Sequence, residues 1–202
     1  MYLVWEMMLY MKITITGALY SGKSTVAKAI SEALDYTYFS VGELQRKLAV
    51  DKGMSITEYN KFMLDNNLDN EVDNRTIEIG REKENFIFDA RLAWYFIPDS
   101  FKIYLKVELE VAVERAMKNE RGKSEKYVSK QEAKGNITER RRLEFTRFMD
   151  IYNIDLDKDS NYDLIIDTSH ITMEEVIKKT IDKIKDVIIK NVIIKNNHKS
   201  PQ

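Results

Sequence analysis

The sequence predicts an α/β fold in which five parallel strands form a sheet between layers of helices. Three observations carry this prediction. Short strand-like runs alternate with longer helix-compatible segments, a phosphate-binding motif follows the first run, and further polar residues follow the second and third runs. Alternation of this kind gives a parallel sheet with right-handed crossovers, and ligands bind where its strands end. We therefore expect one domain with its site at the carboxyl edge of the sheet.

The strand-like runs are short and rich in β-branched and aromatic residues. They are residues 12–16, 36–39, 85–89, 101–105 and 163–167. Residues 41–80 are mostly helix-compatible, with a break near Gly53. We interpret this stretch as a helical lobe inserted between the second and third strands, with Thr57 as the N-cap of one helix.

A phosphate-binding loop follows the first strand. Gly17-Ala18-Leu19-Tyr20-Ser21-Gly22-Lys23-Ser24 has the pattern G-x-x-x-x-G-K-[ST], and a helical pattern begins at Lys23. Backbone N–H groups of such a loop and the positive end of the helix can converge on one anion. We expect Lys23 to reach the β- and γ-phosphates of ATP and the Ser24 hydroxyl to ligate Mg²⁺. The predicted ATP-binding residues are these eight and Thr25.

The composition limits the possible partners and metals. A chain of 202 residues, 44% hydrophobic and 32% charged, fits one globular domain, and its net charge of -1 supplies no field for nucleic acid. With no cysteine and 2 histidines, the chain has neither disulfides nor a zinc site of thiolate or imidazole ligands, so any metal should be Mg²⁺.

Residues 1–11 are apolar but lack the basic start and the cleavage site of a signal peptide, and they are too short to span a bilayer. We expect a cytoplasmic monomer with small-molecule substrates and neither a nucleic-acid nor a membrane partner.

The third strand ends in Asp89, and Arg91 follows two residues later. A carboxylate at this point can hold Mg²⁺ through water or orient the acceptor, while Arg91 can grip a phosphate of the acceptor. Arg46, on the helix after Gly42, can reach the same phosphate from the inserted lobe. Ser24 and Asp89 are therefore the predicted metal ligands.

Every arginine lies between Arg46 and Arg147, whereas lysine supplies the positive charge elsewhere. Guanidinium groups bind phosphate through paired hydrogen bonds, and a transferring phosphoryl group is stabilised mainly by such positioned charges. We interpret residues 119–136, which carry Gly122 and Gly135, as a mobile flap that delivers arginines and excludes water. Consecutive helical residues point in different directions, so at most two of the three arginines at 140–142 can face one site. The arginines in and beside the flap are Arg115, Arg121, Arg140, Arg141, Arg142 and Arg147.

These residues together resemble the nucleoside monophosphate kinases, most closely the cytidylate kinases of archaeal type. The resemblance covers residues 12–184 and depends on an ordered series of motifs beyond the phosphate loop. The series is Lys12-Ile13-Thr14-Ile15-Thr16-Gly17, Phe39-Ser40-Val41-Gly42-Glu43-Leu44 with Arg46, Asp89-Ala90-Arg91-Leu92-Ala93, Arg115, Arg121, Arg140, Glu144, Arg147-Phe148, Tyr152-Asn153-Ile154-Asp155 and Tyr162-Asp163-Leu164-Ile165-Ile166-Asp167-Thr168-Ser169.

The resemblance implies a three-layer P-loop kinase fold in a single domain. Its core would be residues 12–40, 81–117 and 141–187, with an acceptor-binding insert at 41–80, a lid at 118–140, and tails at 1–11 and 188–202. It also implies that ATP with Mg²⁺ is the phosphate donor and that CMP or dCMP is the acceptor.

The same resemblance assigns roles to individual residues. Lys23, Arg91, Arg115 and Arg121 would be catalytic, and Arg121, Arg140 and Arg147 would serve the lid. Asp73 and Arg75 are candidates for reading the base edge, because a carboxylate and a guanidinium match the amino and carbonyl groups of cytosine. The predicted acceptor-binding residues are Arg46, Asp73, Arg75, Asp89 and Arg91.

The chain departs from the family pattern at three places. Ala18-Leu19-Tyr20 replaces a loop interior rich in proline and glycine, Ala90 stands in a step that usually contains glycine, and Phe148 replaces a usual tyrosine. Tyr20 is bulky for a loop that wraps phosphate. Two other functions stay open at this point: a P-loop kinase for another small-molecule acceptor, and an ATP-binding regulatory module that has lost transfer activity.

Overall fold

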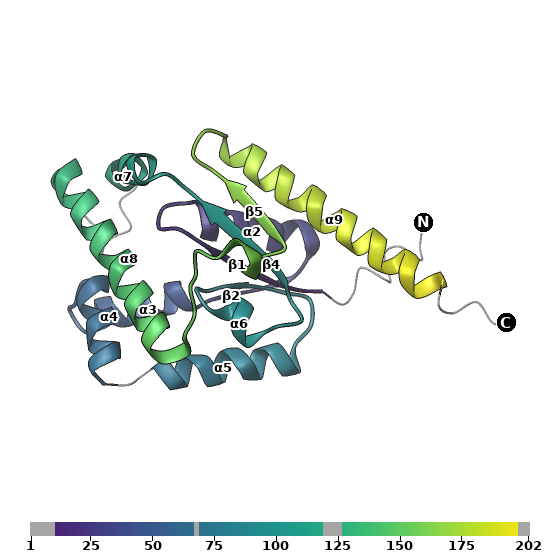
Figure 1. Cartoon of the computed structure of the whole chain (residues 1–202), viewed down its shortest axis with the longest axis horizontal. Helices are drawn as coiled ribbons and strands as arrows, with labels where there is room; N and C mark the ends of the chain where they lie inside the picture. The colour runs from purple at the N-terminus through teal and green to yellow at the C-terminus, as the bar shows by residue number, and fades with distance from the viewer. Residues whose placement is uncertain (1–10, 67–68, 119–126, 198–202) are drawn as a thin grey trace.

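The computed structural model describes residues 11–66, 69–118 and 127–197 and contains a five-stranded parallel sheet with helices on both faces (Figure 1). The strand order is β2-β3-β1-β4-β5, and every pair is parallel. The predicted α/β fold is confirmed, and each strand overlaps the run that predicted it. The strands are β1 Lys12–Gly17, β2 Thr37–Ser40, β3 Phe86–Asp89, β4 Phe101–Lys106 and β5 Leu164–Asp167.

Helices connect the strands and form the two outer layers. They are α2 Lys23–Leu34, α3 Val41–Asp51, α4 Ile56–Asp65, α5 Asp69–Glu82, α6 Ala93–Phe96, α7 Leu109–Lys118, α8 Lys130–Tyr152 and α9 Met173–Asn197, with the 3-10 turn η2 at Asp159–Asn161. Helices α3, α4 and α5 fill the stretch that was predicted as an inserted helical lobe.

The N-cap of α4 is Ser55 and not the predicted Thr57. Ser55 Oγ accepts a hydrogen bond from the Glu58 N–H at 3.2 Å, and Glu58 Oε2 accepts one from the Ser55 N–H at 2.7 Å. This reciprocal pair is a capping box, and it starts the helix two residues earlier than Thr57 would allow.

The alternation of side chains along β1 explains how the layers pack. Ile13 and Ile15 are fully buried on the face that α2 and α9 cover, because these two helices present apolar residues to that face. Thr16 points to the other face, where its hydroxyl donates to the Ala90 carbonyl at 2.9 Å. On that other face, Phe86 and Phe88 of β3 pack against α5 and α6. The sheet is therefore buried on both faces, and the loops at the ends of its strands are the places where a ligand can contact it.

Helix α8 crosses the boundary that was predicted between the lid and the core. It runs without interruption from Lys130 to Tyr152, so residues 130–140 are not a unit separate from residues 141–152. Gly135, expected as a hinge, lies inside this helix, where Ala133 and Ile137 on either side of it are buried and hold the helix in place. The other expected hinge, Gly122, lies outside the described residues.

Helix α9 also extends beyond its predicted end. Residues 188–197, expected to be a tail, continue the helix to Asn197, because Ile184 and Ile188 keep the apolar face against the sheet. The two described ends of the chain lie on the same side of the molecule (Figure 1). Within the described ranges, no helix combines the length and the apolar character needed to cross a membrane.

Candidate active site

A cleft opens at the carboxyl edge of the sheet, where the phosphate loop, the inserted lobe and α8 meet. It has about 930 Å³ of empty space, including its open mouth. Its walls come from the phosphate loop, from α3 and α5 of the lobe, from the segment after β3, and from α8. The predicted donor and acceptor regions therefore share one cavity.

The phosphate loop leaves the start of α2 available to an anion. Ser40, Ser55, Ser129 and Thr172 cap α3, α4, α8 and α9, each accepting a hydrogen bond from a backbone N–H three residues later. Helix α2 instead begins after Gly22, and no side chain of the described residues caps it. Gly22 has φ 86°, in the left-handed region that glycine adopts freely, so this backbone conformation favours glycine. The first N–H groups of α2 are thus left for an external acceptor.

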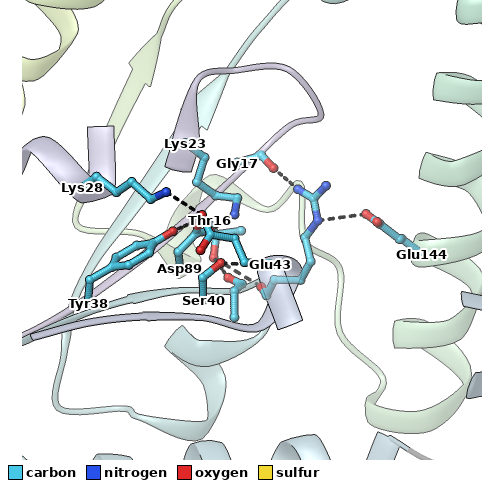
Figure 2. A network of polar contacts seen from close by, with 11 residues as sticks. Thr16, Gly17, Lys23, Lys28, Tyr38, Ser40, Glu43, Asp89 and Glu144 are labelled. Atoms are coloured by element: carbon cyan, nitrogen blue, oxygen red, sulfur yellow. Dashed lines mark hydrogen bonds and ion pairs between the residues drawn. The ribbon is translucent and has the colours of Figure 1, made fainter. Parts of the chain in front are cut away.

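Lys23, which lines the cleft, forms an ion pair with Asp89, which lies behind the cleft lining (Figure 2). The Lys23 ammonium contacts Oδ1 of Asp89, a fully buried carboxylate at the end of β3. The Tyr38 hydroxyl donates to Asp89 Oδ2 at 3.0 Å, and burial raises the pKa of Tyr38, which keeps the proton on that hydroxyl. One cation and one carboxylate therefore lie side by side where the donor and acceptor regions meet.

The residues predicted to hold Mg²⁺ have suitable chemistry. Ser24, half-buried at the start of α2, lines the same cleft as Lys23, whose ammonium contacts the Asp89 carboxylate. The Ser24 hydroxyl and the Asp89 carboxylate supply oxygen atoms, which are the ligands that Mg²⁺ prefers. In the part of the chain that the structure describes, no group of three or more acidic or imidazole side chains could hold a metal alone. Substrate phosphate and water would therefore complete the shell of the ion.

Three arginines surround Glu144 in the wall that α8 contributes. Arg91 Nε lies 3.0 Å from Glu144 Oε2, and Arg140 Nε lies 3.1 Å from Glu144 Oε1. Arg147 lines the same cleft, with its guanidinium carbon 4.7 Å from the centre of the Phe148 ring. Arg91 also donates to the Gly17 carbonyl, so this residue links α8 directly to the phosphate loop (Figure 2).

Glu144 stays ionised in this environment. Burial by itself would raise the pKa of Glu144, but the charges of Arg91, Arg140 and Arg147 together hold that pKa below its ordinary value. The carboxylate neutralises part of a dense positive cluster and fixes the direction of two guanidinium groups. A phosphate entering the cleft would meet arginines that are already oriented.

A Glu144→Gln variant should therefore have a lower free energy of unfolding than the native protein at neutral pH, and the two proteins should be about equally stable in acid. A group with a depressed folded-state pKa stabilises the fold above its unfolded-state pKa of 4.5, and this stabilisation disappears as the pH falls through the lower folded-state value. We expect the variant to be about 2 kcal/mol less stable at pH 7 in denaturant unfolding, with a shrinking difference below about pH 4.5. Glu139→Gln, which removes the carboxylate of an exposed pair with Arg142, is the control and should change nothing measurable. A difference between native protein and Glu144→Gln that is independent of pH would contradict the assignment.

The inserted lobe contributes two of its predicted residues to the cleft. Arg46 of α3 and Asp73 of α5 both line it. The Tyr152 hydroxyl, at the end of α8, donates to Asp73 Oδ2 and so ties the lobe to that helix. A nucleotide bound here would lie between Asp73 on one side and the phosphate loop on the other.

Comparison with known proteins identifies the family. Residues 12–170 match the model of the cytidylate kinase-like family. The chain belongs to this family. It is an enzyme of the nucleoside monophosphate kinase class, as the sequence had predicted.

Relatives of this cytidylate kinase-like chain include whole proteins and part of a longer one. The cytidylate kinase of Methanobrevibacter smithii is 34% identical over 176 residues, which is 87% of this chain and 99% of the relative. A protein of Lacinutrix mariniflava named S-adenosylmethionine-dependent nucleotide dehydratase is 38% identical over 82% of this chain, but the match spans only 34% of that protein. A shikimate kinase structure from Bacteroides thetaiotaomicron superposes with a TM-score of 0.55 at 16% identity, covering 88% of this chain and 98% of that one. The last comparison supports the P-loop kinase fold alone.

Some predicted residues of this cytidylate kinase-like protein lie away from the cleft. Arg75 is exposed and forms an ion pair with Glu78, because it lies two residues from Asp73 on α5 and points elsewhere. The predicted Asp73–Arg75 base-reading pair is therefore not formed in the structure. Thr25 is exposed on α2, and Arg121 lies outside the described residues.

Arg115 is behind the phosphate loop and does not line the cleft. Its guanidinium donates to the Tyr20 carbonyl at 3.1 Å and to Thr168 Oγ1 at 3.0 Å, and burial lowers the pKa of Arg115.

Of the three consecutive arginines on α8, only Arg140 lines the cleft with Glu144. Arg141 donates a hydrogen bond to Asp157, and Arg142 donates one to Glu139. The expectation that at most two of these three face one site is confirmed.

The sequence predicted no role for Glu144, Tyr152 or Tyr38, which the structure places at or beside the cleft. A contact of Glu144 with Arg140 and Arg147 could have been predicted from the sequence, because Glu144 lies four residues after Arg140 and three before Arg147, on one face of a helix. Tyr152 and Tyr38 carry no such signal, since each depends on a partner more than fifty residues away.

Proposed function

We propose that this protein transfers the γ-phosphate of ATP to CMP or dCMP, giving the diphosphate and ADP. One observation carries the proposal: the phosphate loop with Lys23 and the arginine cluster around Glu144 line the same cleft. A single phosphate needs one of these regions, whereas transfer between two phosphates needs both. The named cytidylate kinases among its relatives support the same acceptor.

In this proposal the loop and α2 hold the donor. The uncapped N–H groups at the start of α2 bind the β-phosphate, and Lys23 moves its contact from Asp89 to the phosphates. Ser24 and Asp89 hold Mg²⁺, which neutralises charge on the phosphates when it is bound.

The arginines hold the acceptor and the transferring group. Arg46 and Arg91 bind the phosphate of the monophosphate, so that one of its oxygens lies in line with the γ-phosphorus. That oxygen forms a new bond to the γ-phosphorus. The bond between the γ-phosphorus and the bridging oxygen breaks, and the bridging oxygen leaves as part of ADP. Arg140 and Arg147 face the equatorial oxygens, where negative charge spreads in the transition state.

Asp73 is the proposed reader of the base. Its carboxylate can accept a hydrogen bond from the exocyclic amino group of cytosine, and Tyr152 holds it in place. Because Arg75 lies outside the cleft, the carbonyl of the base needs another donor. Gln45 and Asn60 line the cleft and carry amide groups that can serve.

Two measurements test the proposal against its alternatives. With Mg²⁺ and ATP present, adding CMP should release ADP at a rate that saturates with CMP, while shikimate or gluconate should not. Titration calorimetry should show binding of both ATP and CMP. Binding of ATP without binding or turnover of any monophosphate would favour a regulatory module. The monomeric state and the cytoplasmic location stay predictions of the sequence.

A further inference from the structure

We propose that Tyr20 is a positioning residue that keeps the phosphate loop in register with the arginine-bearing face of α8. This inference rests on the proposed function, because it concerns the distance between the donor loop and the groups that would meet the transferring phosphate. It explains why a bulky residue occupies the middle of a loop that wraps phosphate.

The backbone of Tyr20 has a conformation that disfavours a side chain. Its φ of 62° lies in the left-handed region, which only glycine adopts freely. A non-glycine residue stays in this region where its surroundings over-determine it, and such residues cluster at functional sites. Contacts of the Tyr20 side chain must therefore offset the cost.

The ring of Tyr20 supplies those contacts by packing against two helices. It is 4% exposed, and its hydroxyl lies 3.3 Å from the Tyr127 hydroxyl. Alanines of both helices, Ala112 and Ala116 of α7 and Ala133 of α8, belong to the same buried cluster as the ring. The buried cluster that contains Tyr20 also has Leu19 from the loop, Ala112, Val113 and Ala116 from α7, and Ala133 and Ile137 from α8.

The carbonyl of Tyr20 is fixed as well. Arg115 of α7 donates to it at 3.1 Å and binds Thr168, after β5, with the same guanidinium. The ring and the carbonyl therefore place this part of the loop relative to α7, α8 and the end of β5. The neighbouring N–H groups of the loop, which would bind phosphate, take their position from this attachment.

One face of α8 carries both the docking site for Tyr20 and the arginine cluster. The spacing of three and four residues puts all its members on the same side of the helix. The first two belong to the buried cluster that contains Tyr20, and the last three line the cleft. In order along α8, the residues of this face are Ala133, Ile137, Arg140, Glu144 and Arg147.

The two ends of α8 have different neighbours. Near the carboxyl end, Phe148 is buried with Leu92 and Trp94. The amino end depends on α7 and on Tyr20. Loss of the Tyr20 ring would therefore shift one end of α8 and displace the arginines that lie between the two ends.

Steady-state kinetics of Tyr20→Gly with Mg²⁺, ATP and the best acceptor tests this inference. Glycine accepts the same backbone conformation, so the loop should still bind ATP, but the arginines should be misplaced. We expect kcat to fall about tenfold while KM for ATP changes by less than about twofold. Tyr20→Phe keeps the ring and should recover most of the loss. The control is Asp35→Gly, which relieves a left-handed φ of 55° at the exposed end of α2 and should leave kcat unchanged.

A second variant tests the same contact from α8. Ile137→Ala should also lower kcat, and combining it with Tyr20→Gly should add little, because both variants remove one shared contact. An unchanged kcat in Tyr20→Gly, a loss confined to ATP affinity, or fully additive effects would overturn the inference.

Amide hydrogen exchange separates this inference from the proposed function. In the free protein, residues 130–140 of α8 should exchange faster in Tyr20→Gly than in the native protein, and Asp35→Gly should not change them. If no acceptor is turned over, the proposed function fails, and this exchange result alone decides the role of Tyr20: equal exchange in all three proteins would refute it.

Discussion

Lys23→Met will lower kcat by about a hundredfold to a thousandfold, because it removes a positive charge that is positioned at the phosphates in the transition state. The variant will also be less stable. Lys23 pairs with the fully buried Asp89, and its loss leaves a buried carboxylate with only the Tyr38 hydroxyl as a described partner. We expect a loss of about 1–3 kcal/mol in the free energy of unfolding.

The two effects of Lys23→Met can be separated. Adding Asp89→Asn should return most of the stability, because no uncompensated charge is then buried, but it should not return turnover. Lys28→Met is the matched control, since Lys28 lies on the same helix and pairs with Glu43 in an exposed position. Turnover at the native rate in Lys23→Met would place the reaction elsewhere.

Arg91→Lys will weaken binding of the acceptor much more than binding of ATP. Arg91 uses its fork to join Glu144 on α8 to the Gly17 carbonyl, and an ammonium group cannot reproduce two directed hydrogen bonds from one planar group. We expect KM for CMP to rise by about tenfold or more, with KM for ATP nearly unchanged.

Arg142→Lys provides the comparison for this variant. Arg142 also forms a two-pronged pair, with Glu139, but on the exposed side of α8. Its replacement should leave both KM values unchanged. If Arg91→Lys raised KM for ATP instead, Arg91 would belong to the donor phosphates.

The sheet and the inserted lobe could be predicted from the sequence because their signals are local. Each strand is a short apolar or β-branched run, and the phosphate loop has a fixed pattern of glycine, lysine and serine. The sheet then brings Lys23 and Asp89 together, since parallel strands end at one edge. These features need no knowledge of contacts between distant residues.

The features that could not be predicted depend on tertiary contacts. Gly135 suggests a hinge, but buried Ala133 and Ile137 keep it helical. Arg115 carries the same charge as the arginines of the cleft, yet Thr168, far along the chain, turns it toward the back of the loop. Tyr20 was an unexplained departure in the sequence, and only the packing of α7 and α8 shows where its ring goes.

A comparison of acceptors tests whether this protein is a kinase of CMP or dCMP. The initial rate of ADP formation should be measured with Mg²⁺ and ATP over a range of CMP, dCMP, UMP, AMP and GMP concentrations. We predict that kcat/KM is highest for CMP or dCMP and that Asp73→Asn reduces this preference. Equal values for all five monophosphates, or a clear preference for another one, would contradict it.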